Sequence, residues 1–385
     1  MTALLFWLFF SVFAYTYLGY PGLLILFTGG RKKAGYPQQE LPSVAVLIAA
    51  YNEEEVIAAK LENTLQLEYP ASRKQIIVVA DGSDDRTVDR VKEFTDVELL
   101  YEPTRSGKSA AINRAMECVH ADIVVLTDAN TFLSPGALYE LMAPFTDEQV
   151  GGVAGAKKVV DDGSHAVAGA GEGLYWKYES KLKELEASFY SVIGAAGELF
   201  AFRRSLFQPI PESAITDDFY LSLSINLAGK TISYAPAASG TELASLSLKD
   251  EWNRKVRIAA GGFQSLVFFA SALNPLRNPR LAFQFFSHRV LRWVVTAPAL
   301  LFMFILNGSL VVQQSGWLYN TAFVVQGLFY CMALAGYWFR KGAIPFLQLP
   351  FYFVMMHAAL PVGAWRYMTG RQSAVWQKAK RTVKE

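Results

Sequence analysis

Two oxygen-bearing side chains follow an apolar run in the first half of the sequence. The run from Ile123 to Leu126 is typical of a buried strand, and Asp128 and Asn130 come just after it. Open α/β sheets bind ligands at the carboxyl ends of their strands, where these oxygens would suit a divalent cation and its diphosphate. The same residues would also form a simple Asx turn that binds nothing.

Two more acidic sites lie at comparable places. Asp81 ends another apolar run, and Thr216-Asp217-Asp218 opens a helical pattern. Because neighbouring side chains on a helix diverge by about 100°, we expect only one of Asp217 and Asp218 to face a pocket. Carboxylates at a helix N-terminus also have a simpler role as favourable caps.

A lysine opens another predicted helix. Gly107-Lys108-Ser109 presents backbone N–H groups and an ammonium at the helix N-terminus, which suits an anionic phosphate. A P-loop is excluded, because Glu102 stands where its first glycine is needed. The alternative is an exposed lysine at the start of a helix.

Strands and helices alternate between Ser43 and Asp250, which predicts an α/β domain with a parallel sheet and right-handed crossovers. Beyond Gly151 the pattern becomes irregular. The expected strands are 44–48, 76–79, 98–101 and 123–126, and the expected helices are 54–67, 85–94 and 107–119.

Residues 1–30 contain no charged side chain, and Arg31-Lys32-Lys33 follows at once. Such a run is long enough to cross a bilayer, and its positive charge comes after the apolar residues, unlike that of a cleaved signal peptide. We therefore expect an uncleaved transmembrane anchor over residues 1–30, with its N-terminus outside and residue 31 onward in the cytoplasm.

The second half of the sequence predicts further membrane segments. Trp293 to Phe339 runs for 47 residues without a charged side chain and is divided into two spans by residues 313–316, while 342–365 forms a third. Ile258 to Asn274 is shorter and broken by glycines, so we expect it to lie in the membrane interface. The expected parts are a cytoplasmic domain at 43–250, an interfacial segment at 251–285, transmembrane helices at 286–368 and a basic tail at 369–385.

The composition agrees with a membrane protein. Hydrophobic residues make up 52% of the 385 residues and charged residues 18%. The net charge of +2 gives no reason to expect a nucleic acid as partner. Cys118 lies in the polar domain and Cys331 in an apolar span, so neither a disulfide nor a cysteine metal site is expected.

Taken as a set, these motifs resemble family-2 glycosyltransferases. Four motifs occur in that family's order and spacing, namely Tyr51-Asn52-Glu53-Glu54, Asp81-Gly82-Ser83-Asp84-Asp85, Gly107-Lys108 with Ala111-Ile112-Asn113, and Asp128-Ala129-Asn130. The further match is to membrane-bound members such as the hyaluronan, chitin, cellulose and poly-N-acetylglucosamine synthases. The resemblance implies a Rossmann-like GT-A domain set between one N-terminal and about three C-terminal transmembrane helices.

The resemblance also implies how a donor is held. Tyr51, Glu53 and Asp81 would hold the uridine of a UDP-sugar. Lys108 would contact the nucleotide or its phosphates. Asp128 with Asn130 matches the family's Asp-x-Asp metal motif, so Mg²⁺ or Mn²⁺ is the implied cofactor.

Other positions match the acceptor side of the family's site. Asp218 would be the general base, and the segment with Gly194, Gly197 and Glu198 matches the acceptor site. Apart from the family motifs, Trp176 and Tyr178 would stack on a sugar, unless they only contribute to an amphipathic helix face.

Two departures from the family pattern matter. Asn130 replaces a carboxylate in the metal motif, and a neutral oxygen should bind the cation more weakly. The family's Gln-x-x-Arg-Trp motif is replaced by Arg254-Lys255-Val256-Arg257, in which Arg257 would take the place of the motif arginine on the diphosphate.

The implied reaction is transfer of a sugar from a UDP-sugar, with inversion, to a growing β-linked glycan at the inner, cytoplasmic membrane of the cell. One alternative is a single addition to a lipid-linked acceptor, and another is an inactive scaffold that binds sugar or nucleotide. Membrane lipids would surround the apolar helices. A homo-oligomer or an export partner remains open.

Overall fold

The computed structural model describes residues 1–29, 40–160, 166–195, 197–243, 247–339 and 345–375. The chain forms two compact units. We call the first the helical unit, which comprises Met1–Gly30, Asp161–Lys177 and Ala244–Arg371. We call the second the sheet unit, which comprises Arg31–Val160, Tyr178–Leu243 and Gln372–Glu385.

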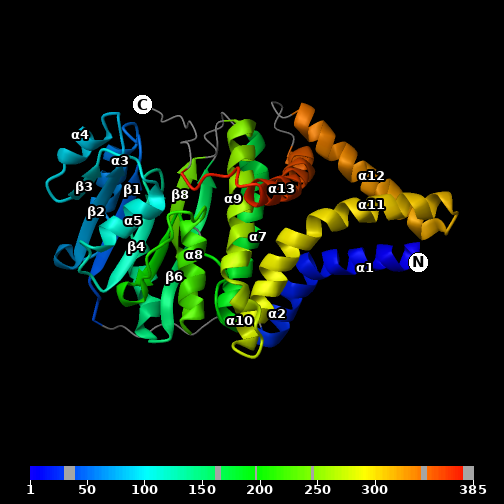
Figure 1. Cartoon of the computed structure of the whole chain (residues 1–385), viewed down its shortest axis with the longest axis horizontal. Coiled ribbons are helices and arrows are strands. Elements are labelled where there is room, and N and C mark those ends of the chain that lie inside the picture. Colours follow the sequence, from blue (N-terminus) through cyan, green and yellow to red (C-terminus); the bar gives the residue numbers. More distant parts are fainter. Residues whose placement is uncertain (30–39, 161–165, 196, 244–246, 340–344, 376–385) are drawn as a thin grey trace. The chain divides into compact units, whose positions relative to one another are not determined.

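The sheet unit is built on one mixed sheet (Figure 1). Within the described residues the sheet has eight strands, in the order β3-β2-β1-β4-β7-β6-β8-β5. Their bounds are β1 Val44–Ala50, β2 Lys74–Asp81, β3 Glu98–Glu102, β4 Ile123–Asp128, β5 Phe132–Leu133, β6 Val150–Val160, β7 Phe200–Arg203 and β8 Thr231–Leu243.

The first four long strands run parallel, as the sequence predicts. β1 pairs in parallel with both β2 and β4, and β2 pairs in parallel with β3. The irregular pattern after Gly151 corresponds to antiparallel β7, which lies between β4 and β6. The parallel order aligns the carboxyl ends of β2 and β4 on the same side of β1, so Asp81 and Asp128 end neighbouring strands.

Two apolar layers enclose the sheet, because side chains alternate along each strand. Val46 and Ile48 of β1 join the core beneath α3, α4 and α6, whereas Ala45 and Leu47 join the core beneath α5, α8 and the end of α7. The helix bounds are α3 Ile57–Leu65, α4 Thr87–Lys92, α5 Lys108–Met116, α6 Ala137–Met142, α7 Ala166–Phe189 and α8 Asp217–Leu227, with short 3-10 helices at Ala71–Arg73, Ala143–Thr146 and Arg204–Leu206.

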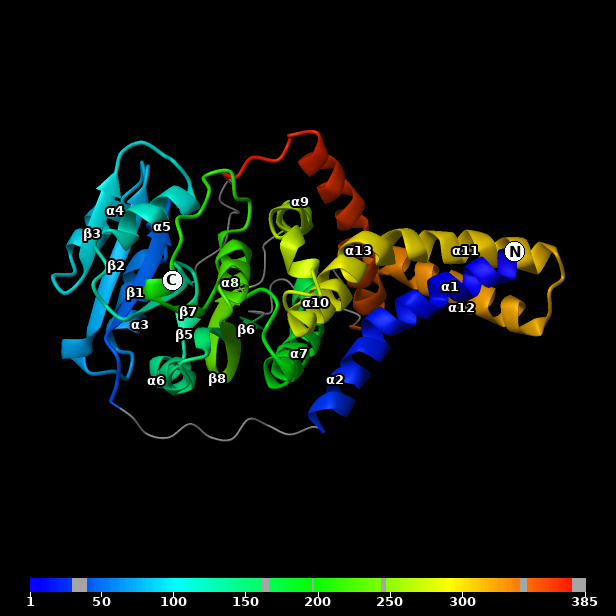
Figure 2. The same cartoon turned by 60° about the horizontal axis from the view of Figure 1, so that its bottom comes forward.

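The helical unit contains long apolar helices (Figure 2). Its elements are α1 Thr2–Ala14, π-helix η1 Tyr15–Gly19, α2 Tyr20–Thr28, α9 Leu248–Phe268, 3-10 helix η5 Ala270–Leu273, α10 Pro279–Phe285, π-helix η6 Phe286–Val295, α11 Thr296–Val312, α12 Trp317–Trp338 and α13 Pro345–Met368. Four segments among the described residues are long and apolar enough to span a bilayer, namely Thr2–Thr28, Pro279–Val312, Trp317–Trp338 and Phe346–Met368. This number matches the sequence expectation.

Helix α9 differs from the segment that the sequence suggested. It starts at Leu248 and continues through Gly261 and Gly262 to Phe268, rather than forming a separate helix over 258–274. Tertiary packing overrides the low helix propensity of glycine here. A Cβ at Gly262 would lie 2.9 Å from the indole ring of Trp293, so the glycine permits close contact rather than a break. The interfacial position of this segment stays a prediction.

Candidate active site

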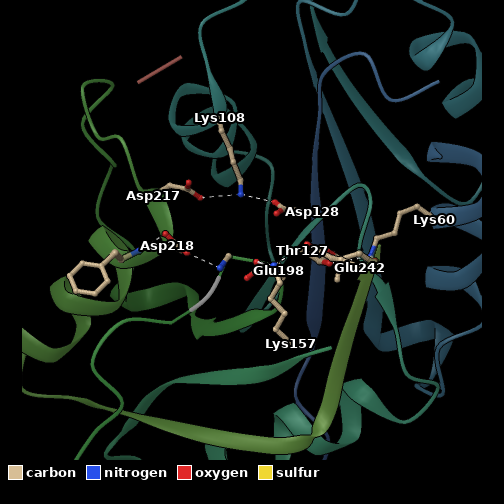
Figure 3. Close-up of polar contacts among 12 residues, drawn as sticks. Lys60, Lys108, Thr127, Asp128, Lys157, Glu198, Asp217, Asp218 and Glu242 are labelled. Atoms are coloured by element: carbon tan, nitrogen blue, oxygen red, sulfur yellow. Dashed lines mark hydrogen bonds and ion pairs between the residues drawn. The ribbon is translucent and has the colours of Figure 1, made fainter. Parts of the chain in front are cut away.

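Lys108 holds two carboxylates together in the sheet unit (Figure 3). Its Nζ lies 2.7 Å from Oδ1 of Asp128 and 3.4 Å from Oδ2 of Asp217. The three residues come from different elements, because Asp128 ends β4, Lys108 opens α5 and Asp217 opens α8. The chain therefore brings together the strand-end acid, the helix-start lysine and the third acidic site that the sequence singled out.

The electrostatics of this cluster favour an ammonium beside carboxylates. Burial lowers the pKa of Lys108, but the carboxylates of Asp128 and Asp217 outweigh that effect and raise it above its usual value. Oδ2 of Asp217 is buried and forms no hydrogen bond in the structure, so the nearby ammonium is its electrostatic partner. This place can therefore hold positive charge at neutral pH.

Asp218 faces the same region from the first turn of α8. Its Oδ2 accepts a 2.7 Å hydrogen bond from the backbone N–H of Gly197, and its Oδ1 accepts one from the N–H of Phe219. Burial, followed by the charges of Asp217 and Glu198, raises its pKa to about 7 despite the opposing charge of Lys108. A carboxyl with such a pKa can accept a proton near neutral pH.

The expectation that only one of Asp217 and Asp218 faces the pocket is wrong. Figure 3 shows the side chain of Asp217 directed toward Lys108 and that of Asp218 directed into the same cluster, where it accepts the hydrogen bond from Gly197. The angular divergence of neighbouring residues separates side chains along the flank of a helix. Here the N-terminal end of α8 points at the site, so both side chains of the first turn reach it.

Asp81 stabilises the turn that precedes Lys108 by accepting hydrogen bonds from its backbone. Its Oδ2 accepts hydrogen bonds from the backbone N–H groups of Ser106 at 3.0 Å and Gly107 at 2.6 Å. Its Oδ1 lies 3.4 Å from a guanidinium nitrogen of Arg114. The carboxylate is almost completely buried, and these contacts set the start of α5 and so the direction of Lys108.

The residues predicted to contact uridine lie at the carboxyl ends of two strands, Tyr51 and Glu53 just after β1 and Asp81 at the end of β2. The guanidinium of Arg105 lies 3.5 Å from the ring centroid of Tyr51, a cation–π contact on the ring face. The backbone N–H of Glu53 donates a 2.7 Å hydrogen bond to the hydroxyl of Thr87. Uridine recognition by Tyr51, Glu53 and Asp81 stays a prediction.

The segment matched to the acceptor site lies beside Asp218. Gly194 has a φ of 86°, a conformation that glycine adopts readily, and Gly197 donates to Asp218 as described. Glu198 forms an ion pair with Lys157. The segment therefore contacts both the candidate base and a buried lysine, while its role in binding an acceptor stays a prediction.

Sequence reasoning missed four buried polar residues next to this site, which are Lys60, Thr131, Lys157 and Glu242. The clearest sign of them in the sequence is Lys60, which lies on the buried face of α3 together with Ile57, Leu61 and Thr64. A lysine on that face requires a polar partner inside the protein. The partners themselves lie far away in the sequence and could not be assigned from the pattern.

The donor atoms beside β4 fit a cation that is shared with a diphosphate. Asp128 and Asn130 supply hard oxygen atoms, and the adjacent ammonium shows that the place favours positive charge. Among the residues that the structure describes, no group of three or more His, Cys, Asp or Glu side chains could hold a metal ion. Mg²⁺ commonly uses one or two carboxylates together with substrate phosphates, which this arrangement matches.

Trp176 and Arg257 belong to the helical unit. The ring of Trp176 meets that of Tyr175 edge-on, with centroids 5.4 Å apart, and both residues lie on α7. Arg257 lies half-buried on α9. Their assignment to sugar stacking and to diphosphate binding stays a prediction.

Comparison with known proteins identifies a family domain that contains much of this site. Residues 45–210 match the model of Glycosyl transferase family 2. The chain is 28% identical over 270 residues to a probable glycosyltransferase, YdaM, of Bacillus subtilis, with 64% of this chain and 62% of that protein covered. It is also 28% identical over 272 residues to poly-beta-1,6-N-acetyl-D-glucosamine synthase of Staphylococcus aureus, with 68% and 65% covered.

These matches span less than two thirds of either relative. Among solved structures, the mannosyltransferase PcManGT from Pyrobaculum calidifontis, in complex with GDP-Man and Mn²⁺, aligns with a TM-score of 0.75. The alignment covers 97% of this chain and 100% of that one at 21% sequence identity. It shows that the chain has the fold of that enzyme, a GT-A fold, and the family match identifies a family-2 glycosyltransferase domain at residues 45–210.

Proposed function

We propose that this chain, which contains a family-2 glycosyltransferase domain, transfers a sugar from a UDP-sugar, with inversion, to a growing β-linked glycan at the membrane. The observation that carries the proposal is the position of Lys108 between Asp128 and Asp217, with Asp218 opening the same helix as Asp217. One part of the cluster suits an anionic leaving group, and the neighbouring part suits removal of a proton.

The donor would lie along the carboxyl ends of β1, β2 and β4. Lys108 would contact the diphosphate, and Arg257 would supply a second cation. Tyr51, Glu53 and Asp81 would contact the uridine, and the hydrogen bonds that Asp81 accepts from the turn before α5 would also keep Lys108 in place. The positive charges would compensate the charge that develops on UDP as the anomeric carbon–oxygen bond breaks.

A divalent cation would be held by Asp128 and Asn130. Mg²⁺ or Mn²⁺ would neutralise developing charge on the diphosphate when bound. The similar mannosyltransferase structure contains GDP-Man and Mn²⁺, which supports a cation in this fold. The neutral amide of Asn130 would make the binding weaker than a second carboxylate would.

Asp218 would act as the general base on the acceptor. Its carboxylate would take the proton of the attacking hydroxyl while the new glycosidic bond forms at the anomeric carbon. A single base without an enzyme nucleophile gives direct attack and inverted configuration, so an α-linked donor would yield a β-linked product. Gly194, Gly197 and Glu198 would border the acceptor, and Trp176 would stack on a sugar.

The cellular setting follows from the donor and the apolar helices. UDP-sugars are cytoplasmic, so the sheet unit would face the cytoplasm at the inner membrane. Membrane lipids would surround the four apolar helices and hold a glycan or a lipid-linked acceptor near the site. The similarity to a poly-beta-1,6-N-acetyl-D-glucosamine synthase supports the glycan.

Product size separates the candidate activities. Membranes containing the full chain would be incubated with individual radiolabelled UDP-sugars, and with GDP-mannose because of the donor in the similar structure. We expect a polymer from one UDP-sugar. A single addition that extracts with lipid would identify the lipid-linked acceptor, transfer from GDP-mannose alone would overturn the UDP assignment, and no transfer from any donor would favour the inactive scaffold.

A further inference from the structure

Lys60 holds both ends of the turn that carries Asp128. Its side chain is completely buried, and its Nζ donates hydrogen bonds to Oγ1 of Thr127 at 3.1 Å and to the carbonyl oxygen of Thr131. We call residues Thr127 to Thr131 the donor turn, because they include Asp128 and Asn130. One lysine amino group from α3 therefore connects the residue before the candidate metal ligands to the residue after them.

A second residue of α3 supports the same region. Asn63 donates from Nδ2 to the carbonyl oxygen of Leu133 at 3.0 Å and accepts from the N–H of Leu133 at 2.8 Å. Within the donor turn, the N–H of Thr131 donates to the carbonyl oxygen of Asp128 at 3.1 Å. The donor turn is thus held from within and from one neighbouring helix.

The polar contacts continue from the donor turn to the segment near Asp218 (Figure 3). Thr131 donates from its hydroxyl to Oε1 of Glu242 at 2.7 Å, and Lys157 donates to Oε2 of Glu242 at 2.9 Å. Lys157 also pairs with Glu198. We call Lys60, Thr131, Glu242, Lys157 and Glu198 the buried network. Within it, Lys157 lies between the carboxylates of Glu242 and Glu198, while burial lowers the pKa of Lys60 to about 7 against the opposing charges of Asp128 and Glu242.

Such a network is costly to build into a core. Removing a lysine from water carries a large penalty, which only well-placed hydrogen bonds and opposite charges offset. Hydrophobic residues of similar volume would stabilise a core at least as well in many proteins. The directional contacts of Lys60 fix where the donor turn lies, which an apolar side chain at position 60 would not do.

We propose that Lys60 is a positioning residue that holds the donor turn in its binding geometry, and that Glu242 and Lys157 couple this turn to Glu198. The proposal rests on the proposed function, since it assigns donor binding to the turn with Asp128. Loss of the Lys60 amino group would remove the hydrogen bonds that it donates to the Thr127 hydroxyl and the Thr131 carbonyl. The turn would then relax, and the carboxylate of Asp128 would lose its place beside Lys108.

Lys60→Met keeps the length and apolar stem of the side chain and removes its charge. Lys74→Met is the matched control. Nζ of Lys74 donates hydrogen bonds to the carbonyl oxygens of Thr64 and Leu65 at the end of α3 and of Leu67 just after it. Both variants lose the hydrogen bonds of a lysine Nζ to or from α3, which are buried at Lys60 and partly buried at Lys74, but only Lys60→Met loses contacts with the donor turn. A general loss of stability would affect both.

The first measurement is binding of UDP with Mn²⁺ to the full chain in detergent, by calorimetry. We expect Lys60→Met to weaken binding by about 10–100-fold, the usual effect of removing a group that orients a metal ligand. Lys74→Met should stay within about twofold of wild type. An affinity for Lys60→Met within twofold of wild type, or equal losses in the two variants, would overturn the proposal.

Thr131→Val provides a second variant if Lys60→Met does not fold. It removes the hydroxyl that donates to Glu242 but keeps the carbonyl that accepts from Lys60. We expect it to weaken binding and to interact with Glu198→Gln in a double-mutant cycle, because both residues belong to the buried network. If the affinity loss of the double variant equals the product of the two single losses within about twofold, the two residues are not coupled and this part of the proposal fails.

Amide hydrogen exchange keeps this proposal separate from the proposed function. If the wild-type chain binds neither UDP nor GDP with Mn²⁺, the donor assignment fails, yet exchange over residues 127–131 still reports whether the turn is held. Faster exchange there in Lys60→Met or Thr131→Val than in Lys74→Met supports the positioning role. Equal exchange in these variants would overturn it.

Discussion

The backbone N–H of Gly197 donates a 2.7 Å hydrogen bond to Oδ2 of Asp218. This contact joins the segment matched to the acceptor site to the candidate general base. A Cβ at position 197 would lie 3.3 Å from the same oxygen, so a side chain there would crowd the carboxylate. The hydrogen bond orients the carboxylate of Asp218 and occupies its Oδ2. Whether Asp218 acts as the base can be tested by removing its ability to accept a proton.

Asp218→Asn should reduce transfer by about 10²–10⁴-fold while UDP binding persists, because an amide keeps the shape but cannot accept the proton as a base. Turnover and UDP affinity of the purified full chain provide the measurement. Asp89→Asn is the control, since Asp89 lies exposed in the first turn of α4 and the same change there should leave turnover unaltered. Retention of more than about a tenth of wild-type turnover would remove Asp218 from this role.

The pH dependence of kcat/KM should report the raised pKa of Asp218. Burial, then the charges of Asp217 and Glu198, raise that pKa to about 7, so the base is protonated below this pH. We expect kcat/KM to fall about tenfold per pH unit on the acid side and to level off above pH 7. Asp217→Asn removes a neighbouring negative charge, so it should lower the pKa and move the acid limb to lower pH. An acid limb unmoved by this variant would contradict the assignment.

The sequence contains enough information to predict the sheet and two of its strand-end acids. Asp81 and Asp128 follow apolar runs whose parallel pairing with β1 brings their ends together. The local pattern does not specify which distant side chains meet in the core. Lys60 and Thr127 are 67 positions apart, and Thr131 and Glu242 are 111 apart, so only the folded chain reveals the buried network.

The expectation for Asp217 was wrong because it assumed that the flank of α8, and not its N-terminal end, meets the site. Helical periodicity describes which side chains share a flank, but it does not say whether the flank or the end of a helix meets a site. The N-terminus of α8 meets Lys108, so two consecutive acids contribute. The bounds of α9 could not be predicted for a similar reason. The helix continues through Gly262 because that glycine packs against Trp293, which local helix propensity does not reveal.

Metal removal should abolish transfer. Asp128 and Asn130 are the proposed ligands of a required divalent cation, so excess EDTA should eliminate activity, and Mg²⁺ or Mn²⁺ should restore it. Asn130→Asp adds a negative charge and should lower the cation concentration needed for half-maximal activity. Metal titrations of wild type and Asn130→Asp provide the comparison. Full activity in EDTA would exclude a required cation.

Arg257→Ala should cost more activity than Arg254→Ala. Arg257 matches the family's motif arginine, whereas Arg254 stands where the family has glutamine and forms a 3.2 Å ion pair with Glu251 in the same helix. We expect Arg257→Ala to lose at least about tenfold in kcat/KM through weaker compensation of the diphosphate. Arg254→Ala should mainly reduce thermal stability. Steady-state rates decide between them, and an unaffected Arg257→Ala would place the phosphate partner elsewhere.

The C-terminal tail can reach either side of the membrane, depending on whether α13 crosses it. Residues 366–385 contain six basic residues and one acid, so the positive-inside rule alone would keep them in the cytoplasm. A re-entrant third C-terminal segment would satisfy that rule, with its broken backbone shielded by neighbouring helices. α13 instead runs without a break from Pro345 to Met368, despite Pro350 and Pro361 inside it.

A continuous helix of 24 residues is about 36 Å long, which exceeds the roughly 30 Å thickness of a bilayer core. Since the first segment usually dominates orientation, we expect α13 to cross fully, giving four transmembrane helices with both termini outside. Alkaline phosphatase fused after Glu385 should be active, and green fluorescent protein at the same place should be dark. Fusions after Phe339 serve as controls with the opposite expectation. A bright fluorescent fusion after Glu385 with inactive phosphatase would mean that the tail is cytoplasmic and that α13 enters and leaves on one side.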